Sequence, residues 1–341
     1  MSDSPYAHYA VMDPEYAALV AQLPPNNFPL DPLEGRKVMN DIVIPLMREQ
    51  QRAAAPDASK YKTVDHSVHL ADMASILVRT ITPVSSEGNT YPVLYWIHGG
   101  GYIFGSADMI EFKMASAAVD LQIAVAMVEY RLAPEHPHPI SVNDCFEGLK
   151  WTADNAASFA GDISKGFIVA GDSAGGSLSA TLTHLARDDP FFQGKQLTGQ
   201  ILQIPNVIDP RAVPEQYKRE LRSMDTTENA KYAGLTRDFL HNMYKLNLKN
   251  SPTDPTASPL LFPSHAYLPP ALVQISGLDL LRDEGLLYEK VLKLAGVKTK
   301  LHVYPGVSHG FHMLFTHLAA AKKFEQDWRD GIQWLLAGAN Q

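Results

Sequence analysis

Cysteine is almost absent from this chain of 341 residues, in which Cys145 is the single one. One cysteine can form no intramolecular disulfide and no cysteine cluster that holds a metal ion. It lies in the stretch "ISVNDCFEGLKW", where Ile140, Cys145, Phe146 and Leu149 recur on one face of a helix. We therefore interpret Cys145 as a buried structural thiol rather than a reactive one.

Clusters of basic side chains are also missing. The 29 lysines and arginines are dispersed among 37 acidic residues, and the net charge is −8. Without a basic patch, neither nucleic acid nor an anionic membrane surface is expected as a partner. No stretch approaches 18 uninterrupted apolar residues, so no membrane span is expected.

The sequence shows no pattern of a secretory signal. Its first residues, "MSDSPYAHYAVMDPEY", carry acids and prolines in place of a basic, then apolar, then small-residue progression. Together with a thiol that is expected to stay reduced, this favours a cytoplasmic protein. Internal repeats and low-complexity runs are absent as well.

What the chain does have is the composition of a soluble protein with a sizeable core, 45% hydrophobic and 19% charged. From about residue 64, strand patterns alternate with helical periods. Strands are expected at 66–71, 75–81, 91–97, 122–130, 166–171, 199–204, 271–276 and 300–305. Helices are expected at 109–120, 140–157, 177–188, 284–296 and 318–336. Helical crossovers of this length predict an α/β fold whose mostly parallel sheet is covered by helices on both faces.

Two segments stand outside this alternation. Residues 1–60 look helical but irregular, with prolines at 24, 25, 29 and 32. Residues 206–262 are too many for a plain loop and contain the amphipathic stretch "RDFLHNMYKLN". We expect an N-terminal cap segment at 1–60, core parts at 61–205 and 263–341, and a cap insertion at 206–262. Whether the insertion is a lid or a set of ordinary surface helices is left open.

The string "GDSAGG" at 171–176 lies between a predicted strand and a predicted helix, and it fits the pattern G-x-S-x-G. A strand that reverses into a helix within a few residues strains the backbone at the turn, here at Ser173. Glycines at 171 and 175 avoid the clashes that Cβ atoms would make. The pattern predicts that Ser173 is a nucleophile at the carboxyl edge of the sheet, near the positive end of a helix dipole.

A second string, "HGGG" at 98–101, follows the strand expected at 91–97. Three successive glycines cost conformational entropy and are expected where bare backbone amides must approach another group. In acyl transfer that group is an oxyanion, which needs N–H donors about 3 Å away. We predict that Gly99 and Gly100 supply two donors and Ala174 a third. A flexible glycine hinge is the alternative.

A serine hydroxyl needs a base to take its proton, and the base needs a third group to orient it. "ALVQISGLDLLRDEG" places Asp279 three residues beyond a predicted strand. Its rival is Asp283, beside Glu284, where capping and the helix dipole already explain an acid. "VYPGVSHGFH" places His309 in a loop after the next strand, whereas a helix is expected from about the position of His312. We predict that Asp279 is the acid and His309 the base.

Five pieces make the chain from about residue 60 onward resemble the hormone-sensitive-lipase-like branch of the α/β-hydrolases. They are, in order, "HGGGYIFGS", "YRLAPEHPHP", "GDSAGG", "LPPALVQISGLDLLRDEG" and "GVSHGF". The resemblance implies an eight-stranded sheet, a lid from the N-terminal segment and residues near 206–262, and esterase or lipase-like activity without a cofactor. It also makes "YRLAPEHPHP" a structural loop that supports the site. It carries the catalytic and oxyanion roles onto Ser173, Asp279, His309, Gly99, Gly100 and Ala174.

The sequence therefore predicts a serine carboxylic-ester hydrolase that acts on small-molecule esters of short to medium chain length through an acyl-enzyme. Three alternatives stay open: a Ser59-x-x-Lys62 hydrolase, a non-catalytic small-molecule receptor on the same scaffold, and an amidase, lactonase or deformylase with the same triad.

The sequence departs from the family pattern at two positions. Leu280 stands where the family usually has proline, and His138 where an aromatic residue is common. The natural substrate and the oligomeric state, a homodimer included, stay open.

Overall fold

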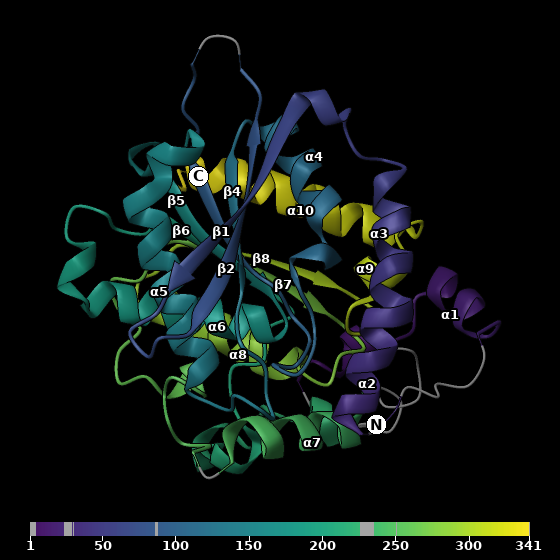
Figure 1. Cartoon of the computed structure of the whole chain (residues 1–341). Helices are drawn as coiled ribbons and strands as arrows, with labels where there is room; N and C mark the ends of the chain where they lie inside the picture. Colours follow the sequence, from purple (N-terminus) through teal and green to yellow (C-terminus); the bar gives the residue numbers. More distant parts are fainter. Residues whose placement is uncertain are drawn as a thin grey trace.

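The computed structural model describes residues 5–23, 29, 31–85, 88–225, 235–249 and 251–340. Its centre is an eight-stranded sheet in the order β1-β2-β4-β3-β5-β6-β7-β8 (Figure 1). The pairs β1/β2 and β2/β4 are antiparallel, and the remaining pairs are parallel. This confirms the mostly parallel sheet that the sequence predicts. The strands are β1 (Tyr61–His69), β2 (Ser75–Pro83), β3 (Val93–Ile97), β4 (Ala124–Glu129), β5 (Phe167–Asp172), β6 (Gly199–Gln203), β7 (Ala271–Ser276) and β8 (Thr299–Tyr304).

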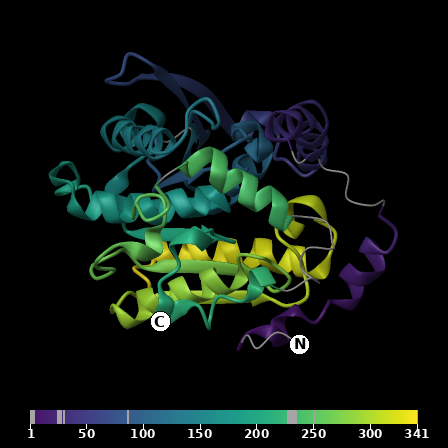
Figure 2. The ribbon, with the colours of Figure 1, turned by 90° about the horizontal axis from the view of Figure 1, so that it is seen from below.

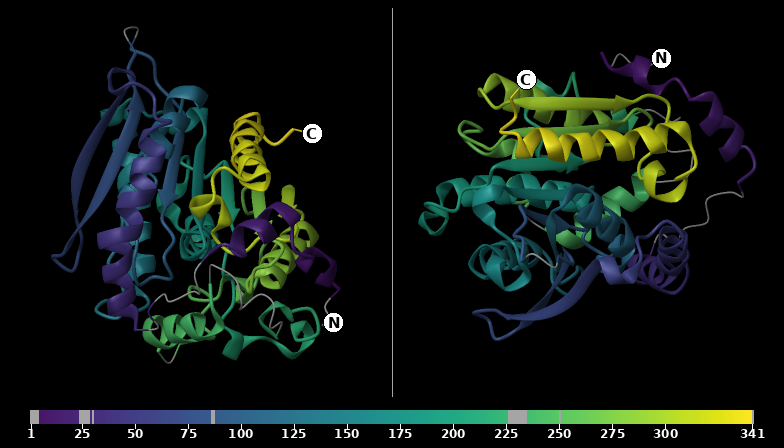
Figure 3. Two further views of the ribbon diagram at one scale, coloured as in Figure 1. Left: turned by 90° about the vertical axis from the view of Figure 1, so that its right-hand side faces the viewer. Right: turned by 90° about the horizontal axis from the view of Figure 1, so that it is seen from above.

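Helices cover both faces of the sheet, as Figures 1 and 3 show. One face carries α4 (Glu111–Leu121) and α10 (Ala319–Leu336), and the other carries α5 (Ile140–Asn155), α6 (Ala174–Asp188) and α8 (Arg282–Leu294). A short helix, α9 (Phe311–Leu314), lies between β8 and α10. None of the helices that the structure describes is both long and apolar enough to cross a membrane.

The central strands are buried on both faces, which explains why their sequences are almost continuously apolar. In β3 every residue is buried. Tyr95 and Ile97 pack in the cluster that includes residues of α5 and α6, whereas Leu94 and Trp96 pack with residues of α4 and α10. The alternation of side chains along a strand thus gives each layer of helices its own core.

The N-terminal segment contributes two separate pieces, drawn in purple in Figure 3. Helix α1 (Pro14–Val20) lies beside the C-terminal part of the chain. Helices α2 (Pro32–Val38) and α3 (Ile44–Arg52) form one long helix, joined by a π-helical turn at Met39–Val43. The carboxylates of Asp13 and Asp31 cap α1 and α2 by accepting backbone N–H groups of the first turn, which a proline opens in each case.

The described residues between β6 and β7 form short 3-10 turns and one longer helix, α7 (Arg237–Leu248). This confirms the helix predicted in "RDFLHNMYKLN". The Thr236 hydroxyl caps α7 by accepting the N–H of Phe239 at 3.2 Å. Phe239, Met243 and Tyr244 are buried beneath it. Figure 2 views the molecule from the side on which α7 lies, in front of the sheet.

Cys145 lies on α5 and is fully buried. Burial raises the pKa of its thiol, because the interior disfavours a thiolate. The expectation of a buried thiol is therefore confirmed.

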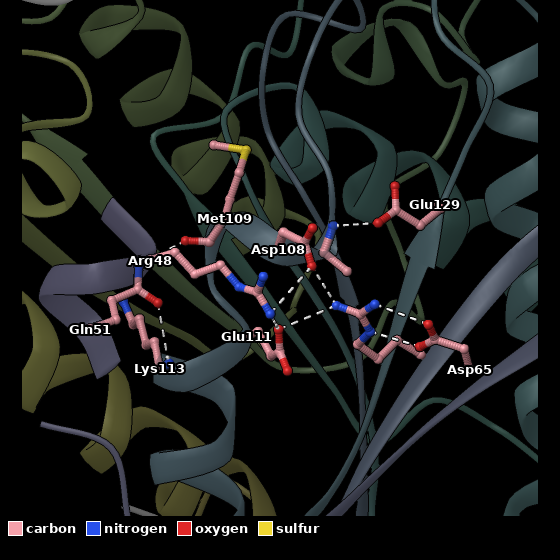
Figure 4. Close-up of polar contacts among 10 residues, drawn as sticks. Arg48, Gln51, Asp65, Asp108, Met109, Glu111, Lys113 and Glu129 are labelled. Carbon is pink, nitrogen blue, oxygen red and sulfur yellow. Dashed lines mark hydrogen bonds and ion pairs between the residues drawn. The ribbon is translucent and has the colours of Figure 1, made fainter. Parts of the chain in front are cut away.

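A network of charged side chains ties α3 to the segment that leads into α4 (Figure 4). Arg79 on β2 pairs with Asp65 at 2.7 Å and with Asp108 at 2.6 Å, and it reaches Glu111 at 3.4 Å. Arg48 of α3 pairs with the same Glu111. Nearby, Gln51 Nε2 donates to Met109 O at 2.7 Å, and Lys113 N donates to Gln51 Oε1 at 3.3 Å. Two cations shared among three acids thus hold the N-terminal helix to the core.

We expect Arg79→Met to lower the free energy of unfolding by about 1–3 kcal/mol, because the substitution removes a half-buried cation that three carboxylates share. The control is Lys218→Met. Lys218 pairs with Glu215, and both side chains are largely exposed. Removal of that pair should cost less than about 1 kcal/mol. Urea denaturation of the three proteins measures the difference, and an equal loss in both variants would contradict the importance of the network.

Candidate active site

Ser173 stands between β5 and α6, where the chain reverses with φ 51° and ψ −117°. This is a left-handed backbone conformation that costs energy for a residue with a side chain. The turn is held by the Ser173 N–H, which donates to Gln203 O at 2.8 Å. The serine is half-buried, whereas its neighbours on both sides are buried. The strand-turn-helix arrangement predicted for Ser173 is therefore present.

Close backbone approach explains the glycines around Ser173. A Cβ atom on Gly175 would lie 2.0 Å from Ile97 O, and one on Gly171 would lie 2.4 Å from the backbone of Gly175. Helix α6 begins at Ala174, one turn before the start expected at residue 177. In the sequence Gly175 and Gly176 look like residues that would interrupt a helix. In the structure they lie in the first turn of α6, where a side chain on Gly175 would not fit.

The side chains of Ser173, His309 and Asp279 form one hydrogen-bonded chain. His309 Nε2 lies 2.9 Å from Ser173 Oγ, and His309 Nδ1 lies 2.7 Å from Asp279 Oδ2. Since a carboxylate only accepts hydrogen bonds, Nδ1 carries the proton and Nε2 is left to accept from the serine hydroxyl. Asp279 is almost fully buried, and its Oδ1 accepts the N–H of Leu281 at 2.9 Å. The structure therefore brings the three predicted residues together.

These residues meet because parallel strands end at the same edge of the sheet. Ser173 follows β5, Asp279 follows β7, and His309 follows β8. The loops that carry Asp279 and His309 are joined directly by the N–H of Leu278, which donates to Val307 O at 2.9 Å. Residues that lie 136 and 30 positions apart in the chain are thus brought within hydrogen-bond distance.

The rival acids are engaged elsewhere. The Asp283 carboxylate accepts from Arg282 Nε at 2.7 Å and from the N–H of Arg222 at 2.9 Å. Glu284 accepts the N–H of Val207 at 2.7 Å, and burial raises its pKa well above the usual range. Both acids lie in the first turn of α8, as the sequence predicts, but they bind the chain between β6 and β7 rather than only capping their own helix.

The rival base and the rival nucleophile also have other contacts. His312 is buried in α9, and its ring stacks on Phe324 with 3.9 Å between centroids. Burial lowers the pKa of His312 well below its usual value. Ser59 Oγ donates to Asp57 Oδ1 at 2.6 Å, in a short exposed turn before β1. Its contact is that of a turn-capping hydroxyl.

The structure contradicts one predicted role in the "HGGG" loop. The N–H of Gly99 donates to Asp172 Oδ1 at 3.0 Å, so it is already engaged with a buried carboxylate. It is therefore not available to an oxyanion. Among the described residues, the N–H groups of Gly100, Gly101 and Ala174 donate no hydrogen bond. Gly100 and Ala174 thus remain candidates, and Gly101 is a candidate that the sequence reasoning missed.

Aromatic and polar contacts hold the "HGGG" loop from behind. The ring of His98 stacks on Tyr130 with 4.3 Å between centroids, and its Nδ1 lies 2.7 Å from Gly99 O. Burial lowers the pKa of His98 to about 4, so its ring is neutral at pH 7. The Tyr130 hydroxyl donates to His98 O at 3.0 Å. Tyr130 opens the "YRLAPEHPHP" segment, and this contact agrees with the supporting role expected for that loop.

The segment after "HGGG" is also held by the N-terminal cap helices. Arg36 of α2 donates to Ile103 O at 2.7 Å and to Ala133 O at 2.6 Å. Its guanidinium also binds Glu135 through two bonds of 2.8 Å. A single cation thus joins α2, the segment after "HGGG" and the "YRLAPEHPHP" segment.

Apolar side chains of α7 lie over the "HGGG" loop. A Cβ atom on Gly101 would lie 2.9 Å from Met243 Sδ and 3.5 Å from a ring carbon of Phe239. The ring of Phe104, which follows the loop, lies 5.9 Å from the ring of Phe239. The wall beside the candidate oxyanion donors is therefore apolar, and it is built partly from the insertion between β6 and β7.

No cluster of three or more potential metal ligands occurs among the residues that the structure describes. The chemistry that this arrangement can perform is nucleophilic attack by an alcohol, with proton transfer through an imidazole. Backbone amides and the N-terminus of α6 lie beside Ser173 and favour negative charge there.

Asp172 is a buried acid next to Ser173 that the sequence reasoning did not single out. It ends β5 and is almost fully buried. Burial raises the pKa of its carboxyl to about 6, against the opposing effect of the bond from Gly99. Its place beside Ser173 in "GDSAGG" is visible in the sequence, but the bond that it accepts from the "HGGG" loop is not.

Replacement of Asp172 should change how stability depends on pH. The folded protein binds the Asp172 proton more tightly than the unfolded chain does, because its pKa rises from 3.8 to about 6 on folding. Deprotonation of Asp172 therefore lowers the stability of the wild-type protein as pH rises from 3.8 through about 6, and Asp172→Asn lacks this effect. We expect the unfolding free energy of Asp172→Asn, minus that of the wild-type protein, to rise by about 2–3 kcal/mol between pH 4 and pH 7. Urea denaturation at several pH values measures it, and a constant difference would refute the shift.

Comparison with known proteins places the chain among α/β-hydrolases. Residues 94–313 match a family described by its alpha/beta hydrolase fold. A carboxylesterase of Mycobacterium tuberculosis, NlhH, is 34% identical over 255 residues, which is 72% of this chain and 74% of that protein.

Two solved structures are similar over nearly the whole chain. A vibralactone cyclase has a TM-score of 0.93 and 40% identity, covering 98% of this chain and 97% of its own. A bacterial heroin esterase has a TM-score of 0.82 and 30% identity, covering 98% of this chain and 99% of its own.

Proposed function

The chain belongs to the α/β-hydrolase family, in its carboxylesterase-type branch, and from this premise we propose that it hydrolyses small-molecule carboxylic esters through an acyl-enzyme on Ser173. The observation that carries the proposal is the hydrogen-bonded chain from Asp279 through His309 to Ser173, beside backbone amides that find no acceptor in the described part of the chain. In this proposal Ser173 is the nucleophile, His309 the base and Asp279 the orienting acid.

The proposed reaction follows from the contacts of these three residues. Ser173 Oγ attacks the ester carbonyl carbon while His309 Nε2 takes the hydroxyl proton. Asp279 accepts from Nδ1, which fixes the ring and stabilises the imidazolium. The tetrahedral oxyanion then collapses, the C–O bond to the alcohol breaks, and His309 protonates the departing alkoxide. Water, activated by the same imidazole, attacks the acyl-enzyme and releases the acid and the free serine.

We assign the oxyanion donors to the N–H groups of Gly100, Gly101 and Ala174. Each lies in the loop after β3 or directly after Ser173, and none is used by another acceptor among the described residues. Gly99 is replaced in this assignment because Asp172 occupies its N–H. Donors that are fixed before the reaction stabilise the developing charge without reorganisation.

The cap segments are part of the same proposal. Residues 1–60 and 206–262 would cover the site and shape its substrate pocket, since α2 binds the segment after the oxyanion loop and α7 contacts the loop itself. The apolar wall formed by Phe104, Phe239 and Met243 favours substrates with an apolar acyl or alcohol group.

A second candidate is the formation or opening of a lactone by the same site. One solved structure with 40% identity over nearly the whole chain is described as a vibralactone cyclase. If a hydroxyl of the acyl group replaced water as the attacking nucleophile, the acyl-enzyme would be released as a lactone, and Ser173 would regain its proton through His309. The choice between water and an internal hydroxyl depends on the pocket rather than on the triad.

A substrate panel tests the proposal. We expect p-nitrophenyl acetate, butyrate or octanoate to be hydrolysed by the wild-type protein, and Ser173→Ala to lose at least about 10⁴-fold in kcat. Lactones and p-nitroanilides in the same panel separate lactonase and amidase activity from esterase activity. Absence of turnover on every ester, together with tight binding of a small ligand, would favour the receptor alternative instead.

Covalent labelling identifies the nucleophile independently of substrate choice. A fluorophosphonate should modify Ser173, and labelling should disappear in Ser173→Ala. Peptide mapping reads the site, and modification at Ser59 would reverse the assignment.

A further inference from the structure

The N-terminal residues 9–20, which we call the strap, lie against the two loops that carry the proposed acid and base. The acid loop is residues 277–281, and the base loop is residues 305–310. Figure 3 shows α1, the helical part of the strap, beside the C-terminal part of the chain in both views. The strap is therefore positioned next to the proton-transfer chain, although it lies outside the sheet.

The strap and the two loops touch backbone to backbone. The N–H of Gly306 donates to Tyr9 O at 2.9 Å, and the N–H of Asp13 donates to Gly306 O at 3.1 Å. A Cβ atom on Gly306 would lie 2.1 Å from Asp13 N, and one on Gly277 would lie 2.2 Å from Tyr9 O. Each loop thus has a glycine where the strap's backbone passes, because no side chain would fit there.

One side chain of the strap reaches the residue next to the proposed base. Tyr16 is fully buried, and its hydroxyl donates to Ser308 Oγ at 2.6 Å. Ser308 is itself buried and directly precedes His309. The Tyr16 ring also packs in the cluster that contains Leu278 and Val307, one residue from each loop.

The position of His309 depends on the base loop, because both ring nitrogens must be in place at once. Its distances of 2.7 Å to Asp279 and 2.9 Å to Ser173 leave little room for a shift of the backbone. The core holds this loop through the bond from Leu278 to Val307 O, and the strap holds it through Gly306 and Ser308. Much of the loop's support therefore comes from the N-terminal segment.

We propose that Tyr16 is a positioning residue for the proposed hydrolysis: its bond to Ser308 holds the base loop so that His309 reaches Ser173 and Asp279 together. This inference rests on the proposed function. Tyr16 touches neither substrate nor the reacting atoms, and it acts through Ser308 and the backbone of His309.

The alternative role of Tyr16 is core packing, and removal of its hydroxyl alone separates the two. Tyr16→Phe keeps the buried ring and deletes the hydroxyl that donates to Ser308. We expect kcat on a p-nitrophenyl ester to fall about tenfold, with KM within twofold, because the loss lies in alignment rather than in binding. The rate of fluorophosphonate labelling of Ser173 should fall in parallel.

The matched control is Tyr288→Phe on α8. Tyr288 is also fully buried, and its hydroxyl lies 3.2 Å from His184 Nε2, away from the proposed catalytic residues. Both variants lose one buried hydroxyl, so they should lower the thermal midpoint by similar amounts. Only Tyr16→Phe should lower kcat. If Tyr16→Phe keeps kcat within twofold of Tyr288→Phe, Tyr16 has only a packing role and the proposal is overturned.

A double-mutant cycle with Ser308→Ala tests the bond itself. Ser308→Ala should lower kcat about as much as Tyr16→Phe, and the double variant should be no slower than either single variant. Losses that multiply in the double variant would show that the two hydroxyls act independently, which contradicts the proposal. Failure of the proposed function would be distinct, because the wild-type protein itself would then neither turn over esters nor be labelled at Ser173.

Discussion

The close passage of α6 across the ends of β3 and β5 is the constraint on which the candidate site depends. Gly175 lies so near the carbonyl of Ile97 that any side chain would collide with it. Because α6 can start at Ala174, Ser173 takes the left-handed conformation, and the amide of Ala174 is left without an acceptor among the described residues. The same approach brings the loop after β3 beside Ser173. The close packing of glycine backbone therefore sets the geometry in which a strained serine lies beside amides that have no acceptor among the described residues.

The sequence alone predicted the mostly parallel sheet, the main helices on its two faces and the three side chains that meet at its edge. Asp279 was preferred to Asp283 because it follows a strand directly, and parallel strands end together. Spacing could not show which way an amide points. The assignment of Gly99 was therefore wrong, since its N–H turns toward Asp172. The contact of Tyr16 with Ser308 joins residues 292 positions apart and follows no motif, so only three-dimensional packing reveals it.

The N-terminal segment contacts two parts of the candidate site through different kinds of contact. Arg36 binds carbonyl oxygens of Ile103 and Ala133, which follow the "HGGG" loop and Tyr130. Tyr16 binds the hydroxyl beside His309. Charged groups around Arg48 and Arg79 hold α3, the second part of the long helix, to β2 and to the segment that leads into α4 (Figure 4). The described parts of the N-terminal segment, α1 and the helix α2–α3, thus support the edge of the sheet at which the candidate site lies.

The solitary, buried Cys145 has a practical consequence. Its side chain on α5 is buried, and its raised pKa keeps the thiol protonated. Maleimide and nitroxide reagents should therefore not react with it. The natural chain is therefore already a background for site-directed labelling, without prior removal of cysteines. A fluorophore or spin probe attached through one cysteine introduced on the exposed surface of α1 or α7 would report on the movement of that helix alone.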